Sequence, residues 1–142
     1  MIKVNYPPFP FKIKQANDKD LIFDEIRKKW LIITPEEWVR QNFIQYLIQE
    51  KKYPPSLIAV EKTIVLNGLK KRCDIIIYKA EKPWMIVECK EQNVPLSEKT
   101  IQQILQYNSA LPSTYLVITN GNSCYGWQIQ PQISMIAEIP FY

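Results

Sequence analysis

The sequence predicts an α/β (α+β) fold, in which helices flank a mixed central sheet and a small β extension lies at the N-terminus. The expected elements follow the order helix, three strands, helix, two strands, which is typical of a sheet covered by helices. The apolar runs 75–77 and 85–87 lack polar alternation, so they should be central strands buried on both faces. A length of 142 residues fits one compact domain. We expect residues 1–33 to form the extension and residues 34–142 the main body.

The extension should contain short strands. Residues 1–10 include three prolines, so this segment is expected to be extended and irregular. Strands are expected at 11–14, at 21–24 and from Trp30 to Thr34, with a turn over 17–20. Together they would form a small antiparallel sheet.

The first helix has a clear start. Thr34 is a suitable N-cap, Pro35 fits the first turn and Glu37 completes a capping box. The helix should run to about Lys52. Its apolar face would carry three residues spaced four apart, Val39, Phe43 and Leu47.

The next three strands follow from apolar runs and turn residues. Residues 57–66 and 69–78 should pair through a hairpin turn at Asn67-Gly68. Lys82-Pro83 is expected to break the chain, and residues 84–90 should form the third strand.

The remaining elements complete the expected order. Ser97 begins a second helix that should reach about Ala110 before Pro112. Strands are expected at 114–119 and 124–129, on either side of a turn at Asn120-Gly121.

Composition excludes several kinds of active site. The chain has no histidine, which removes Ser-His-Asp and Cys-His catalysis, histidine general bases and imidazole zinc sites. Its three glycines form neither a dinucleotide-binding fingerprint nor a P-loop. Hydrolytic chemistry here would have to use carboxylates, lysine, amides, hydroxyls or a metal bound by oxygen.

Charge and cysteine content bear on the partners and the cellular compartment that we expect for the protein. The formal net charge of +4 permits a polyanionic partner without requiring one. Three cysteines without CxxC spacing indicate reduced thiols. No signal peptide and no apolar run of about 20 residues is present, so we expect a soluble cytoplasmic protein with no membrane partner.

Charged residues emerge from the predicted core strands. Glu88 and Lys90 share one face of their strand and Cys89 points to the other face. Asp74 lies in the preceding predicted strand, directly before the apolar run 75–77. A buried carboxylate is costly unless it is paired or binds a metal. The plain alternative is an ion pair between Lys90 and one of the acids.

If Asp74 and Glu88 lie side by side, they offer oxygen ligands suited to Mg²⁺, with Mn²⁺ as a substitute. The backbone carbonyl of Cys89 would be a further metal ligand. Lys90 would orient a water molecule or stabilise developing negative charge.

Two helices add candidate residues. Glu36 falls near the direction of the apolar face of the first helix and would point toward the acids, with Arg40 able to pair with it. The alternative for Glu36 is a favourable interaction with the helix dipole. Gln103 and Tyr107 share a face of the second helix and could reach the acids or a nucleic-acid backbone, or be ordinary surface positions.

Asp74 followed by Glu88-Cys89-Lys90 resembles the motif of the PD-(D/E)xK nuclease superfamily, with Cys73 where that motif often has proline. Residues 34–130 more closely resemble the N-terminal domain of type I restriction enzyme R subunits. Five segments carry this resemblance: Thr34-Pro-Glu-Glu-Trp-Val-Arg-Gln41, Lys71-Arg-Cys-Asp74, Val87-Glu-Cys-Lys90, Gln103-x-x-x-Tyr107-Asn108 and Thr119-Asn-Gly121.

The resemblance implies a restriction-endonuclease-like core and a Mg²⁺-dependent DNA endonuclease. Asp74 and Glu88 would bind metal, Lys90 would be catalytic and Glu36 would assist. Gln103 and Tyr107 resemble a Q-x3-Y element beside the active site of such nucleases. An R subunit also carries a helicase motor, for which this sequence has neither a P-loop nor room, so we expect no DNA translocation by this polypeptide.

Two other functions remain open. The first is a nucleic-acid-binding module without turnover, or one that works with a separate motor or specificity subunit. Basic residues expected near the acids would then hold phosphates: Lys70, Lys71, Arg72, Lys79 and Lys82. Alternatively, aromatic residues form a protein interface: Tyr6, Phe9, Phe11, Trp30 and Trp38. A homodimer would provide the two sites that double-strand cleavage needs.

Overall fold

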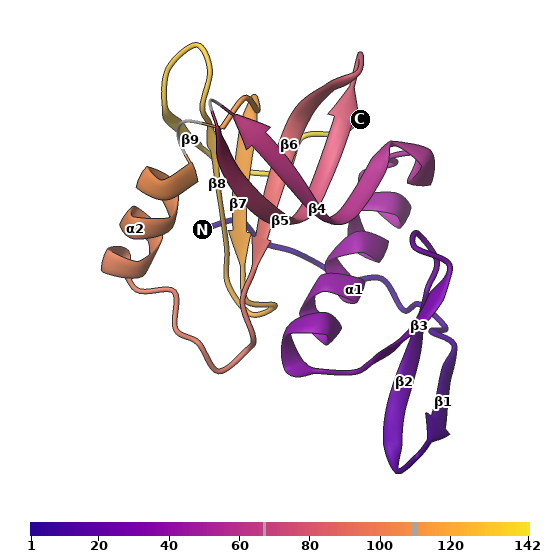
Figure 1. Cartoon of the computed structure of the whole chain (residues 1–142). Coiled ribbons are helices and arrows are strands. Elements are labelled where there is room, and N and C mark those ends of the chain that lie inside the picture. Colours follow the sequence, from indigo (N-terminus) through magenta and orange to yellow (C-terminus); the bar gives the residue numbers. More distant parts are fainter. Residues whose placement is uncertain (67, 109–110) are drawn as a thin grey trace.

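A computed structural model of the chain describes residues 1–66, 68–108 and 111–142 (Figure 1). The predicted turn position Asn67 and the predicted helix end at Ala110 lie outside these residues. The elements are β1 (Ile13–Ala16), β2 (Lys19–Asp24), β3 (Lys29–Ile32), α1 (Pro35–Gln49), a short 3-10 helix η1 (Pro55–Leu57), β4 (Ile58–Leu66), β5 (Leu69–Lys79), β6 (Lys82–Cys89), α2 (Glu98–Asn108), β7 (Tyr115–Thr119), β8 (Cys124–Gln128) and β9 (Ser134–Ile136).

Two sheets confirm the predicted α+β fold and its N-terminal β extension. β1, β2 and β3 form an antiparallel sheet in that order, which projects beyond α1 in Figure 1. The main sheet has the order β4-β5-β6-β7-β8-β9, and only its β6–β7 pair is parallel. The division of the chain at residue 34 into two units stays a prediction.

The two apolar runs are the centre of the core, as predicted. Ile75 and Ile77 pack with Phe43 on the α1 side of the main sheet, while Ile76 and Ile86 pack on the side covered by α2. All five side chains are fully buried. Strands covered on both faces are continuous in hydrophobicity, which is why these runs show no alternation.

The start of α1 is only partly as predicted. Thr34 caps the helix, because its hydroxyl accepts the backbone N–H of Glu37 at 3.0 Å. The capping box is wrong, since the Glu37 carboxylate is buried and turned toward arginines instead. The helix also ends earlier than expected, at Gln49, before Lys52 adopts a left-handed φ of 66°.

The expected break at Lys82-Pro83 is wrong as well. Pro83 lies inside β6 opposite Tyr78, at an irregularity in the β5–β6 pairing. Proline is tolerated there because it sits near the start of a strand, beside a bulge. The turn instead uses Ala80 and Glu81, both with positive φ. β9 was not predicted, because its three residues carry no strand pattern of their own.

Candidate active site

One open cavity brings together most of the predicted site residues. Its volume is about 380 Å³. The residues that line it come from α1, from β4, β5 and β6, and from the position just after β6: Glu36, Arg40, Glu61, Arg72, Asp74, Glu88 and Lys90. Five of these were predicted from the sequence, whereas Glu61 was not and Arg40 was expected only as a partner of Glu36.

Asp74 is held rigidly by two donors. Its Oδ2 atom accepts the backbone N–H of Cys89 at 2.9 Å, which joins β5 to the end of β6. Its Oδ1 atom accepts from Arg40 Nη2 at 2.9 Å. The Asp74 carboxylate is therefore fixed beside the Cys89 peptide, where the sequence had placed a metal-ligating carbonyl.

The carboxylate of Glu88 is mostly buried, and only one of its two oxygens has a partner among the described residues. Its Oε1 atom lies 3.5 Å from Lys71 Nζ, while its Oε2 atom is buried and has no hydrogen-bond partner within the described part of the chain. Burial raises the pKa of Glu88, the nearby charge of Asp74 raises it further, and Lys71 and Lys90 act in the opposite direction. Burying a carboxylate oxygen without a partner costs free energy, so a bound cation at this atom would be stabilising.

Lys90 and Glu36 both line this cavity. Burial raises the pKa of the half-exposed Glu36, as does the charge of Asp74, whereas Arg40 and Lys90 lower it. Lys90 has no carboxylate oxygen within 4.0 Å among the residues that the structure describes. The plain ion pair between Lys90 and an acid is therefore wrong, and its ammonium remains available to a ligand.

A buried arginine–carboxylate cluster lies behind the cavity and was missed by the sequence analysis. Arg40 is 5% exposed; its Nη1 donates to Glu37 Oε1 at 2.7 Å and its Nη2 lies 3.1 Å from Glu61 Oε1. Arg27 Nη2 donates to both Glu37 oxygens at 3.2 Å. The spacing of Glu37 and Arg40 on the helix was a usable signal, but local capping explained Glu37 equally well.

The cluster reaches the N-terminal sheet through Asp24. Its carboxylate accepts from Arg27 Nε at 2.6 Å and from Gln41 Nε2 at 2.9 Å, and it caps the loop by accepting two backbone N–H groups. Burial alone would raise the pKa of Asp24, but these donors outweigh it and hold the pKa below its usual value.

Because the pKa of Asp24 is lowered by folding, its stabilising effect is present above the ordinary aspartate pKa of about 4 and is lost as pH falls through the lower folded value. Asp24→Asn should therefore lower the free energy of unfolding most at pH 7 and progressively less below about pH 4. Urea unfolding at several pH values measures this. A difference that stays constant from pH 7 to pH 2 would contradict it.

Other predicted residues lie outside the cavity. Gln103 and Tyr107 are exposed on α2, and Tyr107 is linked to the site through Lys71, whose Nζ lies 4.4 Å from the Tyr107 ring centre. Lys79 and Lys82 face each other at the far end of the β5–β6 hairpin. The expectation that these two lysines lie near the acids is wrong, because β5 carries Lys79 away from Asp74.

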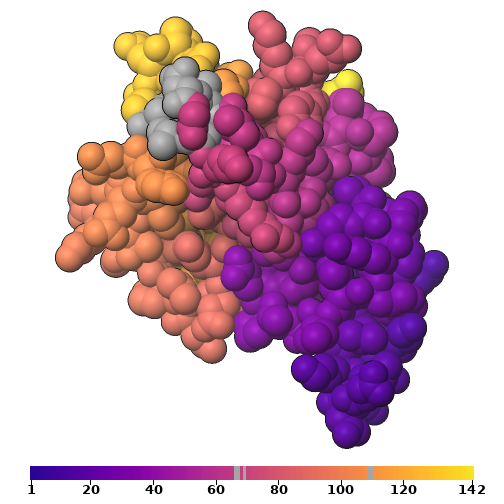
Figure 2. Space-filling model, viewed as in Figure 1, coloured from indigo at the N-terminus to yellow at the C-terminus, as the bar shows by residue number. Residues whose placement is uncertain are grey.

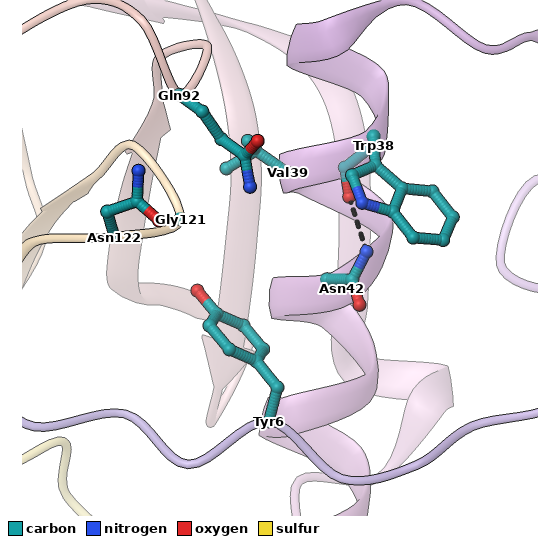
Figure 3. A pocket seen from close by; sticks show the side chains of 7 residues that line it. All are labelled: Tyr6, Trp38, Val39, Asn42, Gln92, Gly121 and Asn122. Carbon is teal, nitrogen blue, oxygen red and sulfur yellow. Dashed lines mark hydrogen bonds between the residues drawn. The ribbon is translucent and has the colours of Figure 1, made fainter.

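A second cavity of about 270 Å³ lies between α1 and the turn after β7 (Figure 3). Figure 3 shows the Tyr6 hydroxyl pointing into it, with Gln92 and Asn122 on the far side. Burial raises the pKa of Tyr6 to about 12, so the phenol stays protonated at neutral pH. The residues that line this cavity carry no charge. It therefore offers hydrogen bonds but no group suited to hydrolysis.

The aromatic residues considered as an interface mostly pack within the fold. Phe11 contacts Phe9 and Trp38 with ring centres 4.9 and 5.3 Å apart, and Tyr6 contacts Tyr46 at 6.0 Å. Trp30 differs, since it remains 38% exposed on β3. Among the described helices, none is long and apolar enough to cross a membrane.

Comparison with known protein families gives a match over most of the chain. The family described as type I restriction enzyme R protein N terminus matches residues 35–140. This range includes every predicted site residue and leaves out the N-terminal sheet. A search of curated proteins found no match.

Proposed function

The chain belongs to the family of type I restriction enzyme R protein N-terminal domains, and from the geometry of its acidic cavity we propose that it hydrolyses DNA phosphodiester bonds with a divalent metal, Mg²⁺ or Mn²⁺. One observation carries this proposal. Asp74 in β5, Glu88 near the end of β6 and Lys90 just after it line a single open cavity together with Glu36. Their convergence on one cavity supports the proposal, because the order of these residues in the sequence resembles the PD-(D/E)xK motif.

The donor set suits Mg²⁺. Magnesium prefers hard oxygen ligands and is commonly held by one or two carboxylates while keeping several waters. Asp74, Glu88 and the Cys89 carbonyl would hold it, and the buried, unpartnered Oε2 of Glu88 supports this assignment. In the described residues, no three acidic or cysteine side chains form a ready-made cage, so solvent must complete the coordination. When bound, the metal would neutralise phosphate charge and activate a water.

Lys90 has the position needed to act on the phosphate. Because it forms no ion pair in the described part of the chain, its ammonium can donate to a phosphate oxygen or orient the attacking water. Its charge would then stabilise the extra negative charge that develops during hydrolysis.

Glu36 is suited to handling a proton. Its side chain is 49% exposed at the cavity mouth, and burial together with Asp74 raises its pKa, which makes it a better proton acceptor than an ordinary surface glutamate. Glu36 would accept a proton from the attacking water. Gln103 and Tyr107 on α2 would contact the DNA backbone instead, together with Lys71 and Arg72.

Lys90→Ala tests this assignment. Removing this unpaired ammonium from the cavity should lower the rate of DNA cleavage by about 100-fold or more, with little effect on stability. Supercoiled, linear and single-stranded DNA would be incubated with Mg²⁺ or Mn²⁺, and products separated by gel electrophoresis. Lys82→Ala is the matched control, since Lys82 is exposed at the far hairpin end. Cleavage by Lys90→Ala at the control rate would refute the role of Lys90.

A second function is favoured by one feature, the ion pair between Arg40 and Asp74. Arg40 already neutralises the acid that would bind metal. A DNA-binding module that does not cleave, or that cleaves only with partner subunits, would keep this pair. Such a module should bind DNA with strong salt dependence and show no Mg²⁺ or Mn²⁺ affinity that Asp74→Ala removes.

The family also suggests assembly. We propose that the domain works on DNA within a multi-subunit complex, with a separate motor or specificity subunit, or as a homodimer that brings two cavities to the two strands. Sedimentation of the chain alone and with duplex DNA distinguishes the homodimer from a monomer.

A further inference from the structure

The outer face of the N-terminal sheet differs from the rest of the surface. Side chains of a β-sheet alternate between faces, and Ile22 and Asp24 are fully buried on the face turned toward α1. The opposite face carries the alternate residues of the three strands. Figure 2 shows this indigo part of the chain as a lobe that projects from the body.

Every charged side chain on that outer face is a lysine. Lys12, Lys14 and Lys19 are all exposed there. The acidic residues of the three strands lie elsewhere: Asp20 is on the other face, and Asp24 is paired with Arg27. Asp18 is exposed in the turn between β1 and β2, next to Lys19. This separation of charge leaves a positive surface without a compensating carboxylate from its own strands.

Aromatic rings hold two of these ammonium groups in place. Lys14 Nζ lies 4.2 Å from the centre of the Trp30 ring, and Lys12 Nζ lies 5.5 Å from that of Phe23. The two rings contact each other edge to face at 5.3 Å. Cation–π contacts limit the freedom of the lysines, so less entropy is lost when an anion binds.

The spacing of the lysines fits a nucleic-acid strand. Residues two apart in a strand are about 7 Å apart, which is similar to the separation of neighbouring phosphates along a DNA strand. We propose that this face, defined by Lys12, Lys14, Lys19, Phe23 and Trp30, is a docking surface for the phosphate backbone of duplex DNA. The proposal rests on the proposed function for its choice of DNA, and it goes further by adding a contact outside the region that the family match covers.

Binding can be measured apart from cleavage. The full chain would be titrated onto a fluorescently labelled duplex in EDTA, and the anisotropy followed at several salt concentrations. The slope of log K against log salt is negative, and each lost phosphate contact reduces its magnitude by about 0.9. Lys12→Gln/Lys14→Gln should therefore reduce the magnitude of the slope by about 2, and the affinity at moderate salt by about 10-fold or more. Lys12→Arg/Lys14→Arg should keep the wild-type slope.

The control variant has the same net charge as Lys12→Gln/Lys14→Gln. Lys52→Gln/Lys82→Gln removes two exposed lysines that lie outside this face and outside the cavity, and its slope should equal that of the wild type. Equal slopes for the two glutamine variants would overturn the proposal, as would absence of duplex binding by the wild type at low salt. Binding of polyglutamate that needs Lys12 and Lys14, while DNA binding does not, would assign the face to an acidic protein and also overturn it.

The outcomes separate this surface from the proposed reaction. A reduced slope in Lys12→Gln/Lys14→Gln supports the docking surface even if the wild type cleaves no DNA with Mg²⁺. Conversely, metal-dependent cleavage with an unchanged slope leaves the proposed function standing and removes only the docking surface.

Discussion

A Glu88→Gln variant is expected to lose DNA cleavage by about 100-fold or more, yet to melt about 2–4 °C above the wild type. The loss of activity follows because an amide is a poor ligand for a divalent cation compared with a carboxylate. The gain in stability follows from the cost of the buried charge, whose Oε2 atom has no partner within the described residues.

The sign of the stability change can be worked out from the pKa. Burial and the charge of Asp74 raise the pKa of Glu88 in the folded state. An acid with a raised folded pKa destabilises the fold at any pH above its unfolded pKa, because ionisation is easier in the unfolded chain. At pH 7 the neutral glutamine removes this cost, although it also removes the contact with Lys71.

Calorimetry measures the melting temperature of Glu88→Gln, and a cleavage assay measures its loss of activity. Glu138→Gln is the control, since Glu138 is an exposed glutamate outside the cavity, and it should change neither quantity. A Glu88→Gln variant that is less stable than the wild type would show that Glu88 serves mainly as a structural ion pair with Lys71.

The largest loss of stability is expected from Glu37→Gln, at about 3 kcal/mol, with a melting temperature lowered by about 10 °C. Glu37 lies between the guanidinium groups of the partly buried Arg27 and the buried Arg40. Removing its charge leaves two cations close together, and breaking one side of a buried ion pair costs more than the pair itself contributes.

Urea unfolding of Glu37→Gln and of Glu50→Gln, an exposed position at the end of the same helix, measures the effect. Glu50→Gln should change the free energy of unfolding by less than about 0.5 kcal/mol. A Glu37→Gln change equally small would mean that Asp74 and Glu61 alone neutralise Arg40.

The parts of the fold that follow local patterns were predictable. The buried face of α1 and the central strands appear directly as periodic or continuous apolar residues, because burial selects those residue types. Pro83 and β9 were not predictable, since both depend on pairing with a neighbouring strand and not on local preference.

The site residues likewise divide into those with a local sequence signal and those without one. Asp74, Glu88 and Lys90 stand out because charges at the ends of apolar strands are unusual, and the structure brings them to one cavity. Glu61 has no such signal. It sits in β4 with a φ of 51°, and its register position opposite Asp74 is missing from the strand pairing. Only the folded sheet shows that this residue joins Arg40 and Arg72 at the cavity.

Diffraction from crystals soaked in Mn²⁺ shows whether Asp74 and Glu88 hold a divalent metal in this cavity, because anomalous scattering locates the metal. We expect a peak at about 2.0–2.6 Å from carboxylate oxygens of both Asp74 and Glu88, with Arg40 moved away from Asp74. The peak should be absent in Glu88→Gln crystals. A wild-type cavity without a peak at saturating Mn²⁺, and with Arg40 still bound to Asp74, would contradict the claim that this cavity holds a catalytic metal.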